Sequence, residues 1–252
     1  MEKMRGGNIR GLSLVMKRIS VVVATYKDKL INLNKTIESV IYQTYKNWEI
    51  IIVDGADCGI KTADNIKVIK TPPRGISDAF NKGVEVARGN YMYFIGAGDY
   101  LWRVDVLEKM MKGVDKEKDM LVCGRINRVS EDGKIIRYTS TLNFKKWQLL
   151  YKMGLPHQAL FTNKKFFEKY GMFDLNCKYS MDYELLLRAY KTWPGVMMKD
   201  VVVAVWAEGG IGKNRINQVL DEYRRIRIKN KITNENVINL IFWLSRLWLK
   251  MK

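Results

Sequence analysis

The hydrophobic residues in the first hundred positions of the chain follow two alternating patterns. Nearly continuous apolar runs occur at Ile19–Ala24, Trp48–Val53 and Tyr91–Ile95, and such runs are typical of strands buried on both faces of a parallel sheet. Between these runs, apolar residues recur at helical spacing, first at Leu33, Ile37, Val40 and Ile41 and then at Ile76, Phe80, Val84 and Ala87. This order predicts an α/β fold with an open, mostly parallel central sheet flanked by helices.

The second half of the chain is less regular. A Glu131–Lys134 turn signal predicts a hairpin between Arg125 and Tyr138. We also expect helices over Val104–Met111, Phe166–Tyr170 and Tyr183–Tyr190, and strands over Met120–Cys123 and Val201–Trp206. From Ile211 onward the composition becomes basic, with ten Lys or Arg against three Asp or Glu. The predicted organisation is an N-terminal extension (1–17), one α/β domain (18–210) and a basic, amphipathic helical tail (211–252).

Charge and composition narrow the function classes. The chain has 252 residues, 47% of them hydrophobic, and carries a net charge of +18, with a mean hydropathy of −0.22. The charge favours an anionic partner: nucleic acid, anionic lipid or a phosphorylated small molecule; the alternative is general surface solvation. Its three cysteines are widely spaced, which indicates reduced thiols in a cytoplasmic protein. A single histidine excludes a multi-histidine metal site.

The sequence predicts neither a signal peptide nor a membrane-spanning helix. The first 17 residues lack a continuous apolar core, so we expect no signal peptide. No stretch reaches the roughly 18 to 20 apolar residues that a spanning helix needs.

Acidic and aromatic residues follow the three predicted strands. They occur in Thr25-Tyr26-Lys27, Asp54-Gly55-Ala56-Asp57 and Gly96-Ala97-Gly98-Asp99. Ligands of open α/β sheets bind outside the carboxyl ends of the strands. None of these segments is a GxGxxG or GxxxxGK[ST] phosphate loop, which argues against a dinucleotide dehydrogenase or a P-loop kinase. A diphosphate bound without such a loop calls for Mg²⁺ or Mn²⁺. Asp99 is the candidate ligand, and a turn residue is the alternative.

The ordered set of these motifs resembles the family-2 glycosyltransferases, which have the GT-A fold. The matching segments are ISVVVATY (19–26), SVIYQTYKNWEIIIVDG (39–55), GISDAFNKGVEVARGNYMYFIGAGD (75–99), Pro156-His157-Gln158, Gly171-Met172-Phe173-Asp174, Asp182-Tyr183-Glu184-Leu185 and Gly209-Gly210-Ile211. They run in order from about Ile19 to Lys231.

The resemblance implies a role for each matching position. Thr25, Tyr26 and Asp54 would hold the nucleotide base, and Asp78 and Lys82 would line the nucleotide side of the cleft. Asp99 would bind the Mn²⁺ or Mg²⁺ that bridges the diphosphate, and Asp182 would be the general base; an N-cap is the alternative for Asp182. His157 would lie near the acceptor or diphosphate, unless it is a core imidazole. The chain departs from the family pattern in having one carboxylate in its Ala97-Gly98-Asp99 metal motif and Met181 where many relatives have a second acid.

The tail carries a further signal. Val237–Leu249 (VINLIFWLSRLWL) has thirteen residues and one charge, with five cations upstream at Arg224, Arg225, Arg227, Lys229 and Lys231. Basic residues beside tryptophans and leucines favour an anchor at an anionic membrane surface. A helix docked on the domain or against a dimer partner is the alternative.

The expected function is therefore inverting transfer of a sugar from a nucleotide-sugar, with UDP as the expected nucleotide, to a lipid-linked or growing surface glycan. The expected location is the inner face of the cell membrane, as a peripheral protein. One alternative is a nucleotidyltransferase of similar fold, although ATYKDK (24–29) lacks the glycines of its nucleotide loop. The other is a basic nucleic-acid-binding protein, which the acidic strand ends disfavour. The oligomeric state is left open.

Overall fold

The computed structural model describes residues 18–129, 134–138, 142–207 and 215–251. The first half of the chain contains β1 (Ile19–Thr25), α1 (Leu30–Ile41), β2 (Trp48–Asp54), β3 (Ile66–Lys70), α2 (Ile76–Val86), β4 (Tyr91–Gly96) and β5 (Tyr100–Leu101). The second half contains α3 (Val106–Met111), β6 (Leu121–Val129), β7 (Ile135–Tyr138), η1 (Lys146–Leu150), η2 (His157–Ala159), β8 (Leu160–Asn163), α4 (Lys164–Tyr170), α5 (Met181–Arg188), β9 (Met197–Ala207), α6 (Ile216–Lys229) and α7 (Glu235–Lys250).

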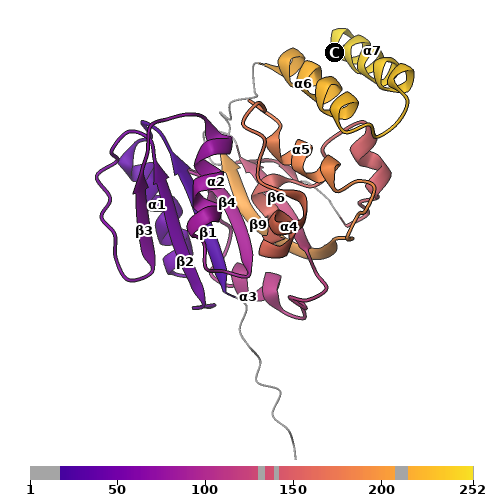
Figure 1. Cartoon of the computed structure of the whole chain (residues 1–252). Helices are drawn as coiled ribbons and strands as arrows, with labels where there is room; N and C mark the ends of the chain where they lie inside the picture. The colour runs from indigo at the N-terminus through magenta and orange to yellow at the C-terminus, as the bar shows by residue number, and fades with distance from the viewer. Residues whose placement is uncertain (1–17, 130–133, 139–141, 208–214, 252) are drawn as a thin grey trace, which may run out of the picture.

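The described strands form one sheet in the order β3-β2-β1-β4-β8-β6-β9-β5, with β7 paired to β6. Strands β1 to β4 are parallel, β8 runs antiparallel between β4 and β6, and β9 is parallel to β6. This mixed sheet with covering helices confirms the predicted fold class. β1 begins at the lower edge of the sheet in Figure 1, so the carboxyl ends of the parallel strands lie along the upper edge.

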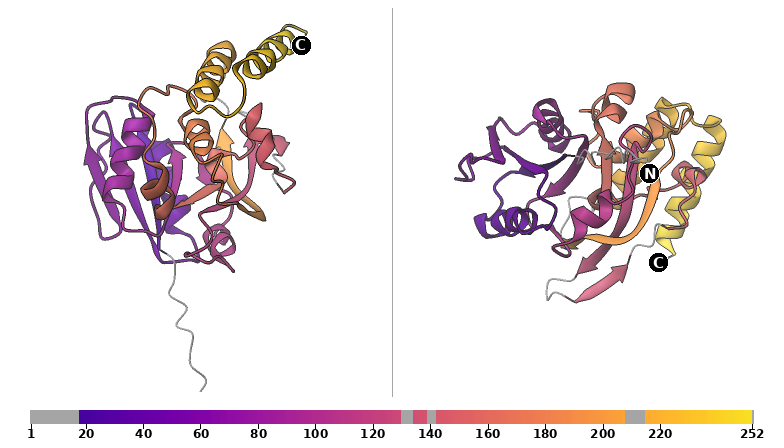
Figure 2. Two further views of the ribbon diagram at one scale, coloured as in Figure 1. Left: turned by 45° about the vertical axis from the view of Figure 1, so that its right-hand side comes forward. Right: turned by 90° about the horizontal axis from the view of Figure 1, so that it is seen from below.

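The two helices of the first half cover opposite faces of the sheet, α2 in front of it and α1 behind it in Figure 1, as the view from below in Figure 2 also shows. This placement follows from the strand order. The chain moves from β1 outward to β2 and later returns from β3 to β4 on the other side of β1, and right-handed crossovers in opposite directions place their helices on opposite faces. Their apolar residues at helical spacing, such as Leu33, Val40 and Phe80, are buried against the strands.

The strands predicted after the first half differ in extent from those observed. β6 and β9 are longer than expected, and β3, β5 and β8 were not predicted. β3 reads IKVIK and is only partly buried, because it forms the outer edge of the sheet. The predicted hairpin exists, since Asn127 pairs with Tyr138. Its turn at 130–133 and the Gly209-Gly210-Ile211 signature lie outside the described residues.

Two helices follow the sheet near the C-terminus, and both lie above its carboxyl-end edge (Figures 1 and 2). α6 packs against α5, where Glu222, Ile226 and Arg227 are buried. α7 packs on α6 through Ile238 and Phe242. Within the part of the chain that the structure describes, no helix combines the length and apolarity needed to cross a bilayer.

Candidate active site

The strand-end residues that the sequence singled out lie along one edge of the sheet. Thr25 is in register with Asp54 on the neighbouring strand, and Ala24 is in register with Gly96 on the other side. The backbone N–H of Gly55 donates to the carbonyl of Thr25 at 3.0 Å and closes the β1 and β2 ends together. Parallel pairing thus brings the loops after β1, β2 and β4 side by side.

Asp54 is a buried acid whose carboxylate organises the loop after β2. It is 2% exposed, and its two oxygens accept the backbone N–H groups of Ala56 at 3.0 Å and Cys58 at 2.7 Å. Burial alone would raise the pKa of Asp54, but these hydrogen bonds, with the charge of Lys70, outweigh it and hold the pKa below its usual value. Asp54 is therefore a fixed anionic acceptor at the strand end.

A shallow pocket opens beside Asp54, lined by Asp54, Gly55, Ala56, Asp57, Lys70, Thr71 and Pro72. The ring of Tyr26 lies beside Gly55, a pocket-lining residue, and Tyr26 is 51% exposed, with the Lys27 ammonium 5.2 Å over the ring. Thr25 is buried and donates its hydroxyl to Asp28 at 2.9 Å, which shapes the loop carrying Tyr26. A planar ring beside a buried hydrogen-bond acceptor suits a nucleotide base.

Asp78 and Lys82 border the same pocket from α2. They form an ion pair at 2.7 Å, one helical turn apart, and both are partly buried. The Lys82 ammonium also donates to the hydroxyl of Thr71, a pocket-lining residue. Asp54, Thr71, Lys82 and Asp78 therefore belong to one connected polar group.

Asp99 ends a tight loop held by a buried threonine of α1. The hydroxyl of Thr36 donates to the carbonyl of Asp99 at 2.7 Å and accepts the N–H of Gly98 at 2.9 Å. Gly98 has φ +104°, a conformation that side chains disfavour. The Asp99 carboxylate lies close to Gly96, with Oδ2 3.7 Å from the position that a Cβ of Gly96 would take.

A divalent cation at this loop would be bound by the Asp99 carboxylate and by oxygens of the bound substrate. Among the described residues no three His, Cys, Asp or Glu side chains gather as a metal-binding group. Magnesium sites of this kind use one or two carboxylates and complete the shell with substrate phosphates and water. A single carboxylate beside an open glycine backbone fits that mode.

Asp182 and His157 form a second group. They line one small cavity with apolar residues from β4, β8, α4, α5 and the loop between α4 and α5: Phe94, Leu160, Phe166, Phe173, Leu185 and Leu186, together with Thr162. The His157 ring stacks on Phe94 with centroids 5.6 Å apart, and its Nε2 has no hydrogen-bond partner. Burial lowers the pKa of His157, and the nearby Asp182 charge opposes this only in part. His157 is therefore a neutral imidazole beside Asp182, away from the Asp54 pocket.

The helix that carries Asp182 is held by residues that the sequence did not reveal. Ser180 is the N-cap residue of α5, so Asp182 lies inside the first turn and is not the cap. Glu222 of α6 is buried and accepts the backbone N–H groups of Lys178 at 2.7 Å and Tyr179 at 2.8 Å, just before that turn. A glutamate in a basic tail reads as solvated, and no local pattern marks it as buried.

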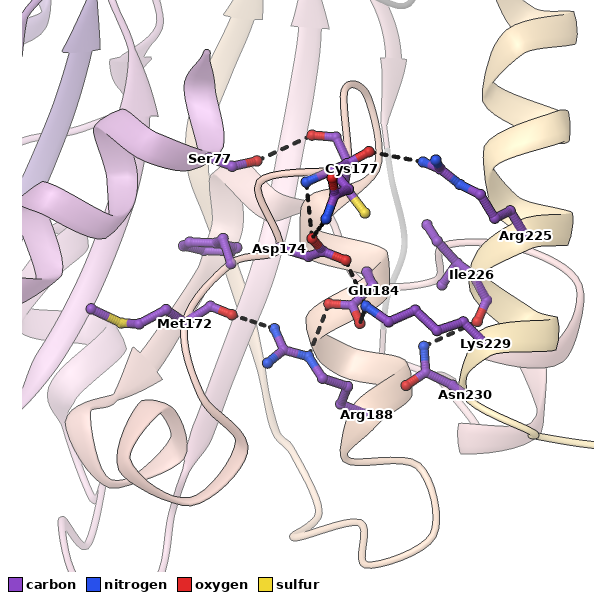
Figure 3. A network of polar contacts seen from close by, with 12 residues as sticks. Ser77, Met172, Asp174, Cys177, Glu184, Arg188, Arg225, Ile226, Lys229 and Asn230 are labelled. Carbon is purple, nitrogen blue, oxygen red and sulfur yellow. Dashed lines mark hydrogen bonds and ion pairs between the residues drawn. The ribbon is translucent and has the colours of Figure 1, made fainter. Parts of the chain in front are cut away.

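A polar network fastens the same region to the rest of the fold (Figure 3). Glu184 of α5 is fully buried and pairs with Arg188 at 2.9 Å and Lys229 at 3.4 Å. Lys229 of α6 also contacts Asp174 at 2.6 Å. From the other half of the molecule, Ser77 donates to the carbonyl of Cys177 at 3.2 Å. The network therefore joins α2, α5, α6 and the 172–178 loop.

The comparisons with known proteins agree with this arrangement. The family model for glycosyl transferase family 2 matches residues 20–179, which is more than half of the chain. The chain therefore belongs to glycosyl transferase family 2 and is a glycosyltransferase. This confirms the family that the sequence motifs indicated.

Individual relatives and solved structures extend the likeness over most of the chain. It is 25% identical over 231 residues to a PGL/p-HBAD biosynthesis glycosyltransferase of Mycobacterium bovis, covering 85% of both chains. It is 31% identical to the putative glycosyltransferase EpsH of Bacillus subtilis over 125 residues, which is 46% of this chain and 36% of EpsH. The structure of S. aureus TarS 1–349 with UDP-GlcNAc superposes with a TM-score of 0.65 at 15% identity, covering 89% of this chain and 70% of that one. The mannosyltransferase PcManGT of Pyrobaculum calidifontis, with GDP-Man and Mn²⁺, gives 0.62 at 15% identity, covering 86% and 65%. The fold is thus of the GT-A type.

Proposed function

We propose that this protein is an inverting, metal-dependent glycosyltransferase that moves a sugar from a nucleotide-sugar, in the first instance a UDP-sugar, to a glycan hydroxyl. The observation that carries the proposal is the shared edge of the sheet, where the Asp54 pocket and the Asp99 loop follow β2 and β4, the two strands that flank β1. Fold neighbours solved with UDP-GlcNAc and with GDP-Man and Mn²⁺ support a donor of this class.

The nucleotide end of the donor belongs in the Asp54 pocket. Its base would lie against Tyr26, and a ring N–H would donate to the Asp54 carboxylate. Since Asp54 is buried and kept ionised, this hydrogen bond is of the charge-assisted kind. Lys82 lies beside the pocket as a cation for the diphosphate.

The sugar end of the donor belongs between Asp99 and Asp182. Asp99, with the diphosphate oxygens, would hold a Mn²⁺ or Mg²⁺ ion, which supplies positive charge for the leaving group. Asp182 takes the proton from the acceptor hydroxyl, whose oxygen forms the new bond at the anomeric carbon as the bond to the diphosphate breaks. One displacement inverts the configuration at that carbon, and the diphosphate leaves without an acid catalyst.

A screen for donor hydrolysis tests the proposal. The full chain is offered UDP-, GDP- and dTDP-sugars with Mn²⁺ or Mg²⁺, and release of the nucleoside diphosphate is measured. We expect a UDP-sugar to be hydrolysed, the activity to stop in excess chelator and to return with metal, and Asp99→Asn to lose it. Full activity in excess chelator would exclude the role of Asp99.

We further propose that α7 attaches the enzyme to the inner face of an anionic membrane, where a lipid-linked or growing surface glycan would be the acceptor. One face of α7 packs on α6, and the other exposes a row of apolar residues that are each 44% exposed or more: Val237, Leu240, Trp243, Leu244, Leu247, Trp248 and Met251. Their spacing makes one continuous helical stripe. Described residues 215–251 hold eight Lys or Arg against three acids, a net charge of +5, which complements anionic lipid.

The basic residues and the apolar face of this tail contribute unequally to the proposed attachment. Arg227 is buried, Lys229 pairs with Asp174, and Arg225 pairs with Glu222. These three cations serve the fold, so the apolar face of α7 supplies the larger share of the attachment. We expect the full chain to pellet with anionic vesicles and to be partly released by salt.

Two substitutions on the exposed stripe test this attachment. Leu244→Glu with Leu247→Glu should abolish pelleting and leave donor hydrolysis unchanged, because both side chains are exposed on α7. Val104→Glu is the matched control, since it charges an exposed apolar residue next to α3. Loss of folding or of a dimer in the double variant, in place of loss of vesicle binding, would assign the stripe to a protein contact.

A further inference from the structure

Two aromatic rings lie exposed at η1 and at the residue that follows it, in a segment that the reaction scheme above does not use. Trp147 is 57% exposed and Tyr151 is 36% exposed, and their ring centroids are 5.7 Å apart with planes 36° from parallel. Among the ring contacts of the described residues, this is the pair in which both rings are exposed. Exposing two large rings to water is unfavourable, so the pair calls for an explanation.

The segment that carries the two rings is closed on itself. The Gln148 side chain accepts the backbone N–H of Lys145 at 3.1 Å, and its carbonyl accepts the N–H of Lys152 at 3.0 Å. Phe144 packs over Gly154 so closely that a Cβ at Gly154 would lie 2.8 Å from the ring. The two rings are therefore carried by a preformed segment (144–154), which lowers the conformational entropy lost when a ligand binds.

Buried hydrogen bonds connect this segment to α5, the helix that carries Asp182. The carbonyl of Leu149 accepts the hydroxyl of Tyr183, the residue that follows Asp182. The same hydroxyl accepts Nε of Arg227 at 2.9 Å, and the Arg227 guanidinium lies over the rings of both Tyr183 and Tyr223. Leu149, Tyr183 and Arg227 are all buried. The segment with the exposed pair is thus hydrogen-bonded to the residue that follows Asp182 on α5.

We propose that Trp147 and Tyr151 form a carbohydrate-binding platform, on which a sugar ring of the glycan acceptor stacks while its hydroxyl reaches Asp182. This inference rests on the proposed function, in which Asp182 takes the proton from the acceptor hydroxyl. A sugar ring presents C–H groups on its face and hydroxyls at its rim. Rigid aromatic side chains accept the face, while at the rim the neighbouring Lys152 can donate hydrogen bonds and Gln148 can donate or accept them.

The small extent of the pair favours a sugar over a lipid surface. Lys145, Lys146 and Gln148 interrupt the apolar positions on η1, and the Lys146 ammonium lies 4.8 Å over the ring of Tyr190. A bilayer contact of the α7 kind is a continuous apolar row, whereas two rings with polar neighbours match the size and amphipathic character of one or two sugar units.

Saturation-transfer NMR with four neutral hexasaccharides tests the platform: maltohexaose, cellohexaose, laminarihexaose and chitohexaose. The full chain should bind at least one of them. Trp147→Ala should weaken that binding about tenfold, the scale of losing an aromatic anchor, and Trp147→Phe should restore most of it. Tyr42→Ala is the matched control, because it removes a 67% exposed ring at the far end of α1. Donor hydrolysis should be unchanged in all three variants.

Four results would decide against the platform. Failure of all four sugars to bind the wild type, equal binding by Trp147→Ala and wild type, or an equal loss in Tyr42→Ala would overturn it. Loss of anionic-vesicle binding in Trp147→Ala, with sugar binding retained, would assign the pair to a lipid surface. If the wild type binds a hexasaccharide through Trp147 but hydrolyses no donor, the proposed function fails and the platform stands.

Discussion

Two parts of the molecule position their acids in different ways: residues 18–101, which we propose bind the donor (the donor half), and residues 102–251, which we propose bind the acceptor (the acceptor half). In the donor half, parallel strand pairing places Asp54 and Asp99 at the carboxyl ends of β2 and β4, the two strands that flank β1, and backbone N–H groups and the Thr36 hydroxyl fix their loops. In the acceptor half, Asp182 lies on the short helix α5, which α6 holds through the buried carboxylate of Glu222 and through Lys229, the partner of buried Glu184 on α5. Backbone geometry tolerates surface changes, whereas a buried charge network fails when one member is removed. The acceptor half should therefore be the more fragile part.

The largest expected effect comes from Glu184, at the centre of that network. Glu184→Ala leaves Arg188 and Lys229 without their buried partner. Removing one member of a buried ion pair costs about 3 kcal/mol or more; because Lys229 is 54% exposed, we expect the lower end of that range. Urea unfolding measures the change. Glu168→Ala, on the exposed side of α4, is the control and should stay within about 0.5 kcal/mol of wild type. Equal stability of the two variants would show that the network does not hold the acceptor half.

The next effect concerns Asp182, which the proposed function makes the general base and not a donor-binding residue. Asp182→Asn keeps the shape of the side chain and removes the base, so turnover should fall by at least about two orders of magnitude. Initial rates of UDP release at saturating donor measure it, with and without the acceptor that the screen identifies. If the variant keeps wild-type turnover with acceptor, another group takes the proton.

A smaller effect is expected in the donor half. Lys82→Ala removes a cation beside the Asp54 pocket and leaves the Asp78 carboxylate unpaired there. We expect the donor KM to rise about tenfold with little change in kcat, on the scale of a hydrogen bond to a charged group. Lys109→Ala breaks an ion pair of the same spacing, with Asp105, and is the matched control. A KM change of equal size in both variants would mean that Lys82 acts only through general charge.

The smallest effect is a pH dependence of stability from the single histidine. Burial lowers the pKa of His157 in the folded protein, whereas the unfolded chain takes up its proton near pH 6.5. The folded state is thus most stable above that pH and loses stability as the pH falls below it. Urea unfolding between about pH 7.5 and about pH 5.5 should show this decline, and His157→Gln should flatten it. A slope that persists in His157→Gln would need a different titrating group.

The same contrast explains how far the sequence predicts the structure. The strands around Val21, Ile51 and Phe94 are buried on both faces and carry unbroken apolar runs, so their positions and their strand-end acids could be predicted. β3 contains Lys67 and Lys70 and lies at the sheet's edge, which hid it. The support of Asp182 was hidden as well, because Glu222 and Arg227 become buried only when α6 docks on α5.

Calorimetric titration of UDP in the presence of Mn²⁺ tests the division between the two halves most directly. Asp54→Ala removes the buried acceptor for the base, and we predict a loss of UDP affinity worth about 1.5 to 3 kcal/mol. Asp182→Asn should bind UDP with the affinity of the wild type, since the base acts on the acceptor. Unchanged affinity in Asp54→Ala, or a collapse of UDP affinity in Asp182→Asn, would contradict the account.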